Sequence, residues 1–226
     1  MKLLGLALSL CLVGTSAVRA QNTTPPADAP QEQKKSVREK FFSLSPPLSL
    51  AENQRPMTTG DKFELFALNT VNPFQFVATA AWAGISQAQN SYPSWGQGAE
   101  GYGKRYAASY ADTASFGFFG TFFFPSLFHQ DPRYFRKLNG TFGQRLGYAL
   151  SRIAVTRTDH GGASPNVSLW MGALSSGGVA NLYYPDANRG VGLTFERAGI
   201  GVATSAGFNV AREFWPDVTH HFHHKK

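Results

Sequence analysis

The chain has 226 residues, a formal net charge of +7 and one cysteine, Cys11. Only 15% of its residues are charged, against about 25% in a typical soluble domain, whereas aromatic residues make up 14%. The lysines and arginines are scattered rather than concentrated on one segment, which argues against a nucleic-acid partner, and a single cysteine excludes a framework of internal disulfides.

The first twenty residues predict a secretory signal peptide. Lys2 gives the segment a positively charged N-terminal region, and residues 3–13 form an apolar run. The small residues Val18 and Ala20 precede the expected cleavage site. The apolar run is too short to span a bilayer. Cleavage would also remove Cys11, so that the mature protein would have no thiol. We therefore expect an exported protein, either periplasmic or associated with the outer membrane.

Residues 21–60 predict an irregular N-terminal arm. Six prolines interrupt this stretch and polar residues fill much of the rest, a composition typical of a linker or a surface arm. A helical pattern follows, in which Asp61 could cap a helix and Glu64 could complete a capping box. Apolar residues then recur at helical spacing to about Gln89, and Pro73 should kink or divide this helix.

The segment from about Gly98 to Phe128 contains the least charged part of the chain. Over its last 22 residues only Tyr110 and Asp112 can ionise, and this stretch would be long enough to cross a bilayer. A turn is expected after it, at His129–Tyr134. Small residues recur along the later segments and would let helix backbones approach closely. These later segments are residues 142–158, 166–184 and 191–215.

The balance of alanine and β-branched residues decides the fold class. After the signal peptide there are 24 Ala but only 13 Val plus Ile, and alanine favours helices whereas β-branched residues favour strands. We therefore predict an all-α fold, a bundle of about five helices after the irregular N-terminal arm. Alternating stretches such as residues 191–195 leave a small outer-membrane-type β-barrel as the alternative.

The predicted organisation is a signal peptide (1–20), a Pro-rich arm (21–60), a single helical domain (61–217) and a His/Lys-rich tail (218–226).

Asp112 is the first candidate for a functional residue, because it is a carboxylate surrounded by Ala, Ser and Phe. A buried carboxylate must be neutralised, paired or hydrogen-bonded. Other ionisable side chains within apolar segments could join it in a polar core, namely Arg145, Arg152, Glu196 and Arg197. Two interpretations stay open: a polar pocket inside the bundle, or an internal network of ion pairs that fixes how the helices pack.

His129 and Asp131 are a second pair of candidates, since a histidine beside a carboxylate could act as a base. The alternative is that this stretch only ends a helix and forms the following turn. The four histidines at the C-terminus could bind a metal ion opportunistically, but nothing in the sequence supplies the supporting hydrogen bonds that a built site needs. We therefore predict no metal site and no cofactor.

Several short stretches occur in an order that resembles a family of exported bacterial envelope proteins without an assigned activity. The stretches are Gly101–Tyr106, His129–Phe135, Gly147–Arg152, Thr156–Asp159, Tyr183–Asp186 and Glu213–Asp217. The resemblance covers roughly residues 90–217 and implies a bacterial envelope protein. It implies no site residues.

Together these features predict a non-enzymatic envelope protein with a structural or binding role, whose partner is a membrane lipid or another envelope protein. One alternative is an enzyme acting on a lipid or cell-wall substrate through Asp112 or the pair of His129 and Asp131. This enzyme alternative requires His129 and Asp112 to face one open cleft. Another alternative is a membrane-embedded transport accessory.

Overall fold

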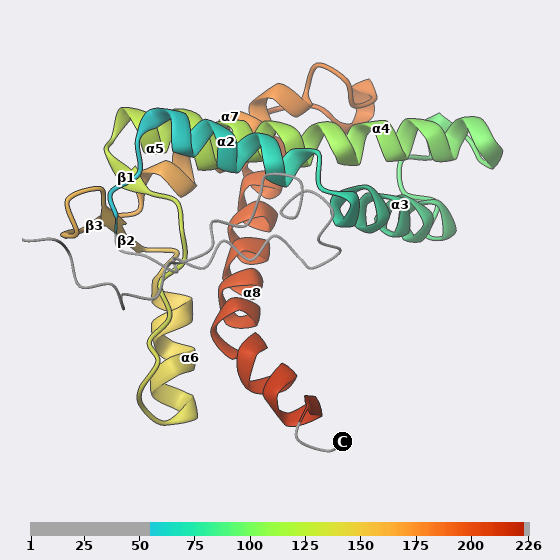
Figure 1. Ribbon diagram of the computed structural model, residues 1–226. Coiled ribbons are helices and arrows are strands. Elements are labelled where there is room, and N and C mark those ends of the chain that lie inside the picture. Colours follow the sequence, from blue (N-terminus) through green and yellow to red (C-terminus); the bar gives the residue numbers. More distant parts are fainter. Residues whose placement is uncertain (1–54, 224–226) are drawn as a thin grey trace, which may run out of the picture. The chain divides into compact units, whose positions relative to one another are not determined.

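The computed structural model describes residues 55–223, so the predicted signal peptide and most of the predicted arm lie outside the described residues. Helices dominate the described part, which confirms the all-α prediction (Figure 1). The helices are α2 (Thr59–Thr70), α3 (Pro73–Ala88), α4 (Gly98–Gly117), α5 (Phe124–Leu127), α6 (Phe142–Ser151), α7 (Val167–Ala180) and α8 (Val191–His223). Short 3₁₀ turns, η1 (Pro93–Trp95) and η3 (Asp186–Asn188), and a π-helical segment, η2 (Phe118–Phe123), complete them.

The division of the first predicted helix at Pro73 is confirmed. Asn72 caps α3 by accepting a hydrogen bond from the backbone N–H of Phe74 at 2.8 Å, and Pro73 follows at a position where its missing N–H costs nothing. The cap predicted for α2 was wrong by one turn. Thr58 is the N-cap, and Asp61 is its partner in the capping box, since each side chain accepts from the other residue's backbone N–H.

The predicted segment from Gly98 to Phe128 forms one run of helix, in which α4 passes through η2 into α5. Pro125 accounts for the π-helical turns between them. It cannot donate to the carbonyl of Thr121 and its ring crowds that carbonyl, and the wider π turn relieves both problems. The aromatic rings of η2 then pack on α2, with the Phe63 and Phe122 centroids 5.2 Å apart.

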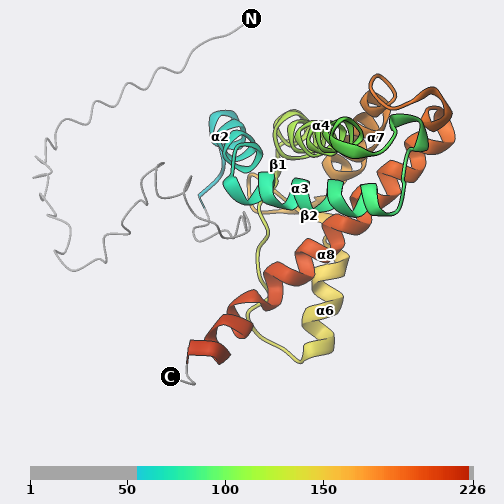
Figure 2. The ribbon, with the colours of Figure 1, turned by 90° about the vertical axis from the view of Figure 1, so that its right-hand side faces the viewer.

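Glycines let α7 approach its neighbours closely, as the small residues along this segment predict. A Cβ on Gly172 would lie 2.7 Å from the Cα of Gly120 in η2, and a Cβ on Gly177 would lie 2.7 Å from the carbonyl oxygen of Thr194 in α8. Figure 2 shows α2, α4 and α7 side by side and nearly end-on, with α8 descending beside α6. Helix α7 is therefore clamped between η2 and α8.

A small antiparallel sheet stands beside the helices in the order β1-β2-β3. Its strands are β1 (Gln130–Asp131), β2 (Val155–Thr158) and β3 (Ala163–Pro165), and Asp131 pairs with Arg157. The prediction of one helical segment over residues 142–158 was therefore wrong in its second half. Helix α6 ends at Ser151, and the β-branched residues at 155, 156 and 158 favour the strand that follows.

Helix α8 extends beyond the predicted end of its segment. It passes Pro216 and reaches His223, so the first residues of the predicted tail are helical. Within residues 55–223, no helix combines the length and the apolar character that a bilayer crossing requires. The buried residues of the described part include as many polar or charged side chains as apolar ones, among them Lys62, Arg105, Asp131 and Glu213. Its interior is therefore held by hydrogen bonds and ion pairs as well as by apolar contact.

Candidate functional site

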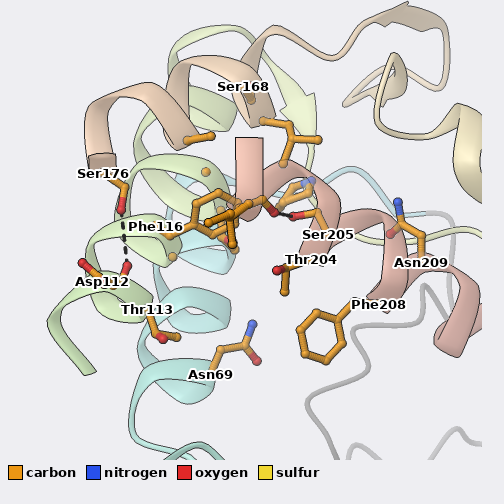
Figure 3. Close-up of a pocket in the computed structure, with 18 of the residues that line it drawn as sticks. Asn69, Asp112, Thr113, Phe116, Ser168, Ser176, Thr204, Ser205, Phe208 and Asn209 are labelled. Atoms are coloured by element: carbon orange, nitrogen blue, oxygen red, sulfur yellow. Dashed lines mark hydrogen bonds between the residues drawn. The ribbon is translucent and has the colours of Figure 1, made fainter. Parts of the chain in front are cut away.

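A cavity of about 960 Å³ lies between α2, α3, α4, α7 and α8. One face of α8 forms a wall of it, with Arg197, Gly201, Thr204, Phe208 and Arg212 recurring every three or four residues. At 1.5 Å per residue this wall is about 22 Å long. Figure 3 shows side chains from α2, α4, α7 and α8 gathered around the same space.

Asp112 projects from α4 at one end of this cavity. Its two carboxylate oxygens accept hydrogen bonds from the hydroxyl groups of Tyr183 and Tyr184, the latter at 2.6 Å. Desolvation raises the pKa of Asp112, whereas the two tyrosine hydrogen bonds and the nearby Arg197 oppose that rise. The pKa of each tyrosine is raised as well, because partial or full burial desolvates the phenols and both face this carboxylate. Asp112 is thus a carboxylate held by fixed neutral donors.

Arg197 lies beside this group on α8. Its guanidinium stacks over the ring of Tyr184, 4.1 Å from the centroid, and its Nη2 donates to the backbone carbonyl of Asn188 at 2.6 Å. Its buried Nη1 has no hydrogen-bond partner among the described residues. Figure 3 also marks the hydrogen bond by which the Ser176 hydroxyl of α7 reaches the backbone carbonyl of Asp112. This end of the cavity is therefore tied to α4, α7 and α8 together.

Arg212, farther along α8, and Arg152, which follows the last residue of α6, also line the cavity. The Nη1 of Arg212 donates to the Asn209 side-chain oxygen at 3.3 Å, whereas its buried Nε has no partner in the described part of the chain. Burial lowers the pKa of Arg212. Arg152 stacks on the ring of Tyr148 at 4.5 Å from the centroid. Two guanidinium groups therefore line the wall here.

The cavity wall combines positive charge with apolar surface. Among the described residues that line it, five are arginine and two are aspartate, and one of those aspartates, Asp131, is already paired with Arg133 at 2.7 Å. Large apolar side chains line the same cavity while remaining exposed, namely Trp82 at 63%, Ile85 at 47%, Ile200 at 58% and Phe208 at 45%. Such a wall suits a molecule with an apolar part and a polar or acidic part.

Glu213 is the centre of a separate polar network that sequence reasoning did not single out. It is fully buried, and its carboxylate accepts from Arg145 Nε at 2.8 Å, the Tyr134 hydroxyl at 2.9 Å and the Lys137 backbone N–H at 3.0 Å. Arg145 also reaches Asp217 at 2.6 Å, one turn further along α8. The spacing of Glu213 and Asp217, four residues apart on one helix, was the available signal. This network attaches α6 and the loop before it to α8.

The structure separates His129 from Asp112, although the enzyme alternative requires both to face one cleft. His129 is exposed, and its backbone adopts a left-handed conformation (φ 52°) just after α5, where such a residue ends a helix. It is not among the described residues that line the cavity, whereas Asp112 and Asp131 are. Asp131 is buried and receives hydrogen bonds from the backbone and the guanidinium of Arg133. His129 and Asp112 therefore do not meet in this cavity.

The predicted polar-core residues divide between several places. Arg152 and Arg197 line the cavity, and Arg145 belongs to the Glu213 network. Glu196 is exposed, so its assignment to a polar core was wrong. It precedes Arg197 by about 100° of helical rotation, which turns one side chain outward when the next faces the cavity.

Among the described side chains, which end at Asp217, no group of three or more His, Cys, Asp or Glu is placed to hold a metal ion. The side chains of the C-terminal histidines lie outside the described residues. No protein-family model, curated protein or solved structure matches this chain. The resemblance to exported envelope proteins therefore stays a prediction, and what the site can do follows from its own side chains.

Proposed function

We propose that the protein is an exported cell-envelope protein that binds a small amphiphile, such as a single-chain lipid, in the cavity along α8. The observation that carries this proposal is that exposed apolar side chains line the same space as two arginines that each have a buried N–H group without a partner in the described region. A binding role agrees with the predicted non-enzymatic function, and a lipid agrees with the predicted partner.

The apolar part of the ligand would cover the exposed side chains of the cavity. Trp82 and Ile85 belong to α3, and Ile200 and Phe208 to α8, so apolar surface reaches the cavity from two helices. Covering such surface is favourable by about 25 cal/mol for each Å² removed from water. An acyl chain would supply that cover without any hydrogen-bonding demand of its own.

The polar groups favour binding over catalysis. Asp112 is held by Tyr183 and Tyr184, which fix its position and occupy an acceptor site on each of its oxygens. Each oxygen keeps a second lone pair, but the described lining holds no histidine, and its other carboxylate, Asp131, is paired with Arg133. Asp112 therefore has no free partner for proton transfer in the described lining and is better suited to keeping the cavity in shape.

Binding can be tested with Nile red, a neutral apolar dye, added to the protein purified without its predicted signal peptide. We expect saturable fluorescence enhancement that dodecyl maltoside displaces. In the variant Thr204→Trp the large ring would occupy cavity space, because Thr204 lines the cavity, and binding should weaken. Ala203→Trp is the matched control, since Ala203 is its exposed neighbour on α8 and lies outside the described lining.

Two results would contradict the proposal: no saturable dye binding by the wild type, or equal weakening by both tryptophan variants. The exported location is tested separately, by sequencing the N-terminus of the protein after fractionation of the expressing cells. Cleavage after Ala20 and recovery in the envelope fractions are the expected results.

A further inference from the structure

We infer that the amphiphile carries an acidic group, a carboxylate or a phosphate monoester, and that the guanidinium of Arg212 binds this group. The inference rests on the proposed function, because it names the chemical class of the ligand for the same cavity. The apolar part of the ligand then extends along α8 toward Gly201 and Arg197.

The hydrogen-bonding state of Arg212 is the first observation. Its Nε is buried and has no acceptor among the described residues, while its Nη1 contacts the side-chain oxygen of Asn209. Buried polar groups in folded proteins nearly always have a partner, and one without a partner calls for an explanation. A guanidinium presents its N–H donors in a planar fork that matches two oxygens of a carboxylate or phosphate. An acidic ligand group would supply the missing acceptor.

The charges around Arg212 are the second observation. The guanidinium groups of Arg212 and Arg152 both lie close enough to Tyr134 to interact with it electrostatically. The carboxylate that also acts on Tyr134, Glu213, already accepts hydrogen bonds from Arg145 and from Tyr134 itself. Burial without a carboxylate partner also lowers the pKa of Arg212. The wall therefore has a surplus of positive charge here, which an anion would offset.

The opposite end of the α8 wall is less suited to an anion. Arg197 has a buried Nη1 without a partner in the described region, but it lies within electrostatic range of the Asp112 carboxylate. An acidic ligand group placed there would meet a carboxylate that has no ion pair among the described residues, whereas near Arg212 it would meet two cations, and the carboxylate there, Glu213, is already paired with Arg145. The ligand is therefore oriented with its acidic group near Arg212.

The test is calorimetric titration of the purified protein with three probes that share one chain length: dodecanoate, dodecyl phosphate and dodecyl maltoside. We expect both anionic probes to bind about tenfold more tightly than the neutral probe, or better, since a hydrogen-bonded ion pair is worth at least that factor. The tighter of the two distinguishes a fatty acid from a phosphorylated lipid. Arg212→Met should abolish the preference and leave dodecyl maltoside binding unchanged.

Two control variants separate a local effect from a general one. Lys104→Met removes one positive charge from an exposed position on α4 outside the described lining, and should keep the full preference. Arg212→Lys keeps the cation without the planar fork, so it should keep part of the preference. It also serves as the test at this position if Arg212→Met does not fold.

Equal affinity of the wild type for the three probes would overturn the inference and leave the proposed function standing. Absence of binding by every probe would overturn both. A loss of affinity in Arg212→Met that is the same for neutral and anionic probes would assign Arg212 a structural role and would also overturn the inference. If acetate or inorganic phosphate bound as tightly as its dodecyl counterpart, the cavity would not take the chain, and the proposed function would fail.

Discussion

The packing of α7 gives a quantitative test of the fold, through the variant Gly172→Ala. The added Cβ would lie 2.7 Å from the Cα and 2.8 Å from the N of Gly120, whereas ordinary contact begins at 3.4 Å. Both obstructing atoms are backbone, so no side-chain rotation relieves the contact and the helices must move apart. Overpacking of this kind costs about 1–3 kcal/mol, and replacing glycine within a helix returns up to about 1 kcal/mol. With the full propensity gain of about 1 kcal/mol, the net loss should be up to about 2 kcal/mol.

Gly178→Ala on the same helix is the matched control. Gly178 is exposed, and an added Cβ there would have no neighbour within 4 Å, so the variant should gain up to about 1 kcal/mol from helix propensity alone. For a chain of this size 1 kcal/mol corresponds to about 2–4 °C in Tm. Thermal unfolding followed by circular dichroism should therefore place Gly172→Ala below the wild type and Gly178→Ala above it. A Gly172→Ala variant as stable as Gly178→Ala would refute the close approach of α7 and η2.

Three further predictions concern the buried polar groups. Glu213→Gln removes the carboxylate that Arg145 and Tyr134 share, and should lower the free energy of unfolding in urea by about 3 kcal/mol. The control Glu196→Gln changes an exposed residue and should alter that free energy by less than about 0.5 kcal/mol. Similar losses in the two variants would contradict the network. Because desolvation raises the pKa of Asp112 above 3.8, its contribution to stability is greatest below that value and is lost as the pH rises through the folded-state pKa. The Tm of Asp112→Asn should therefore improve relative to the wild type between pH 4 and pH 8, and a shift in the opposite direction would rule out this assignment. Arg105→Met removes a buried guanidinium that binds the carbonyls of Ser91 and Gly96, so chymotrypsin should cleave this loop faster than in Lys104→Met; equal rates would count against its role.

Local signals in the sequence predicted the helices well. Pro73 was predicted to divide the first helix, and α3 begins at Pro73 itself. The abundance of alanine favoured helices, and the small residues of α7 predicted its close packing. Such features act over a few residues, so the chain alone reveals them.

The candidate site depends on contacts that no local pattern specifies. Asp112 meets Tyr183 and Tyr184 across 71 and 72 residues of sequence, and Arg145 meets Glu213 across 68. The cavity wall on α8 also mixes glycine, threonine, phenylalanine and arginine, so it shows neither an apolar stripe nor a charged one. The sequence identified Asp112 as a candidate only because this carboxylate is isolated among apolar residues.

This cavity offers a reason for the combination of few charged and many aromatic residues in the chain. Two of its arginines pack on rings: Arg152 lies 4.5 Å from the centroid of Tyr148, and Arg197 lies 4.1 Å from that of Tyr184. A ring attracts the face of a guanidinium and leaves the N–H groups at its edge free to donate. A carboxylate would instead occupy those N–H groups and cancel the charge. Aromatic rings can therefore place an arginine at the cavity without a carboxylate bound to it, which agrees with the acidic ligand proposed above.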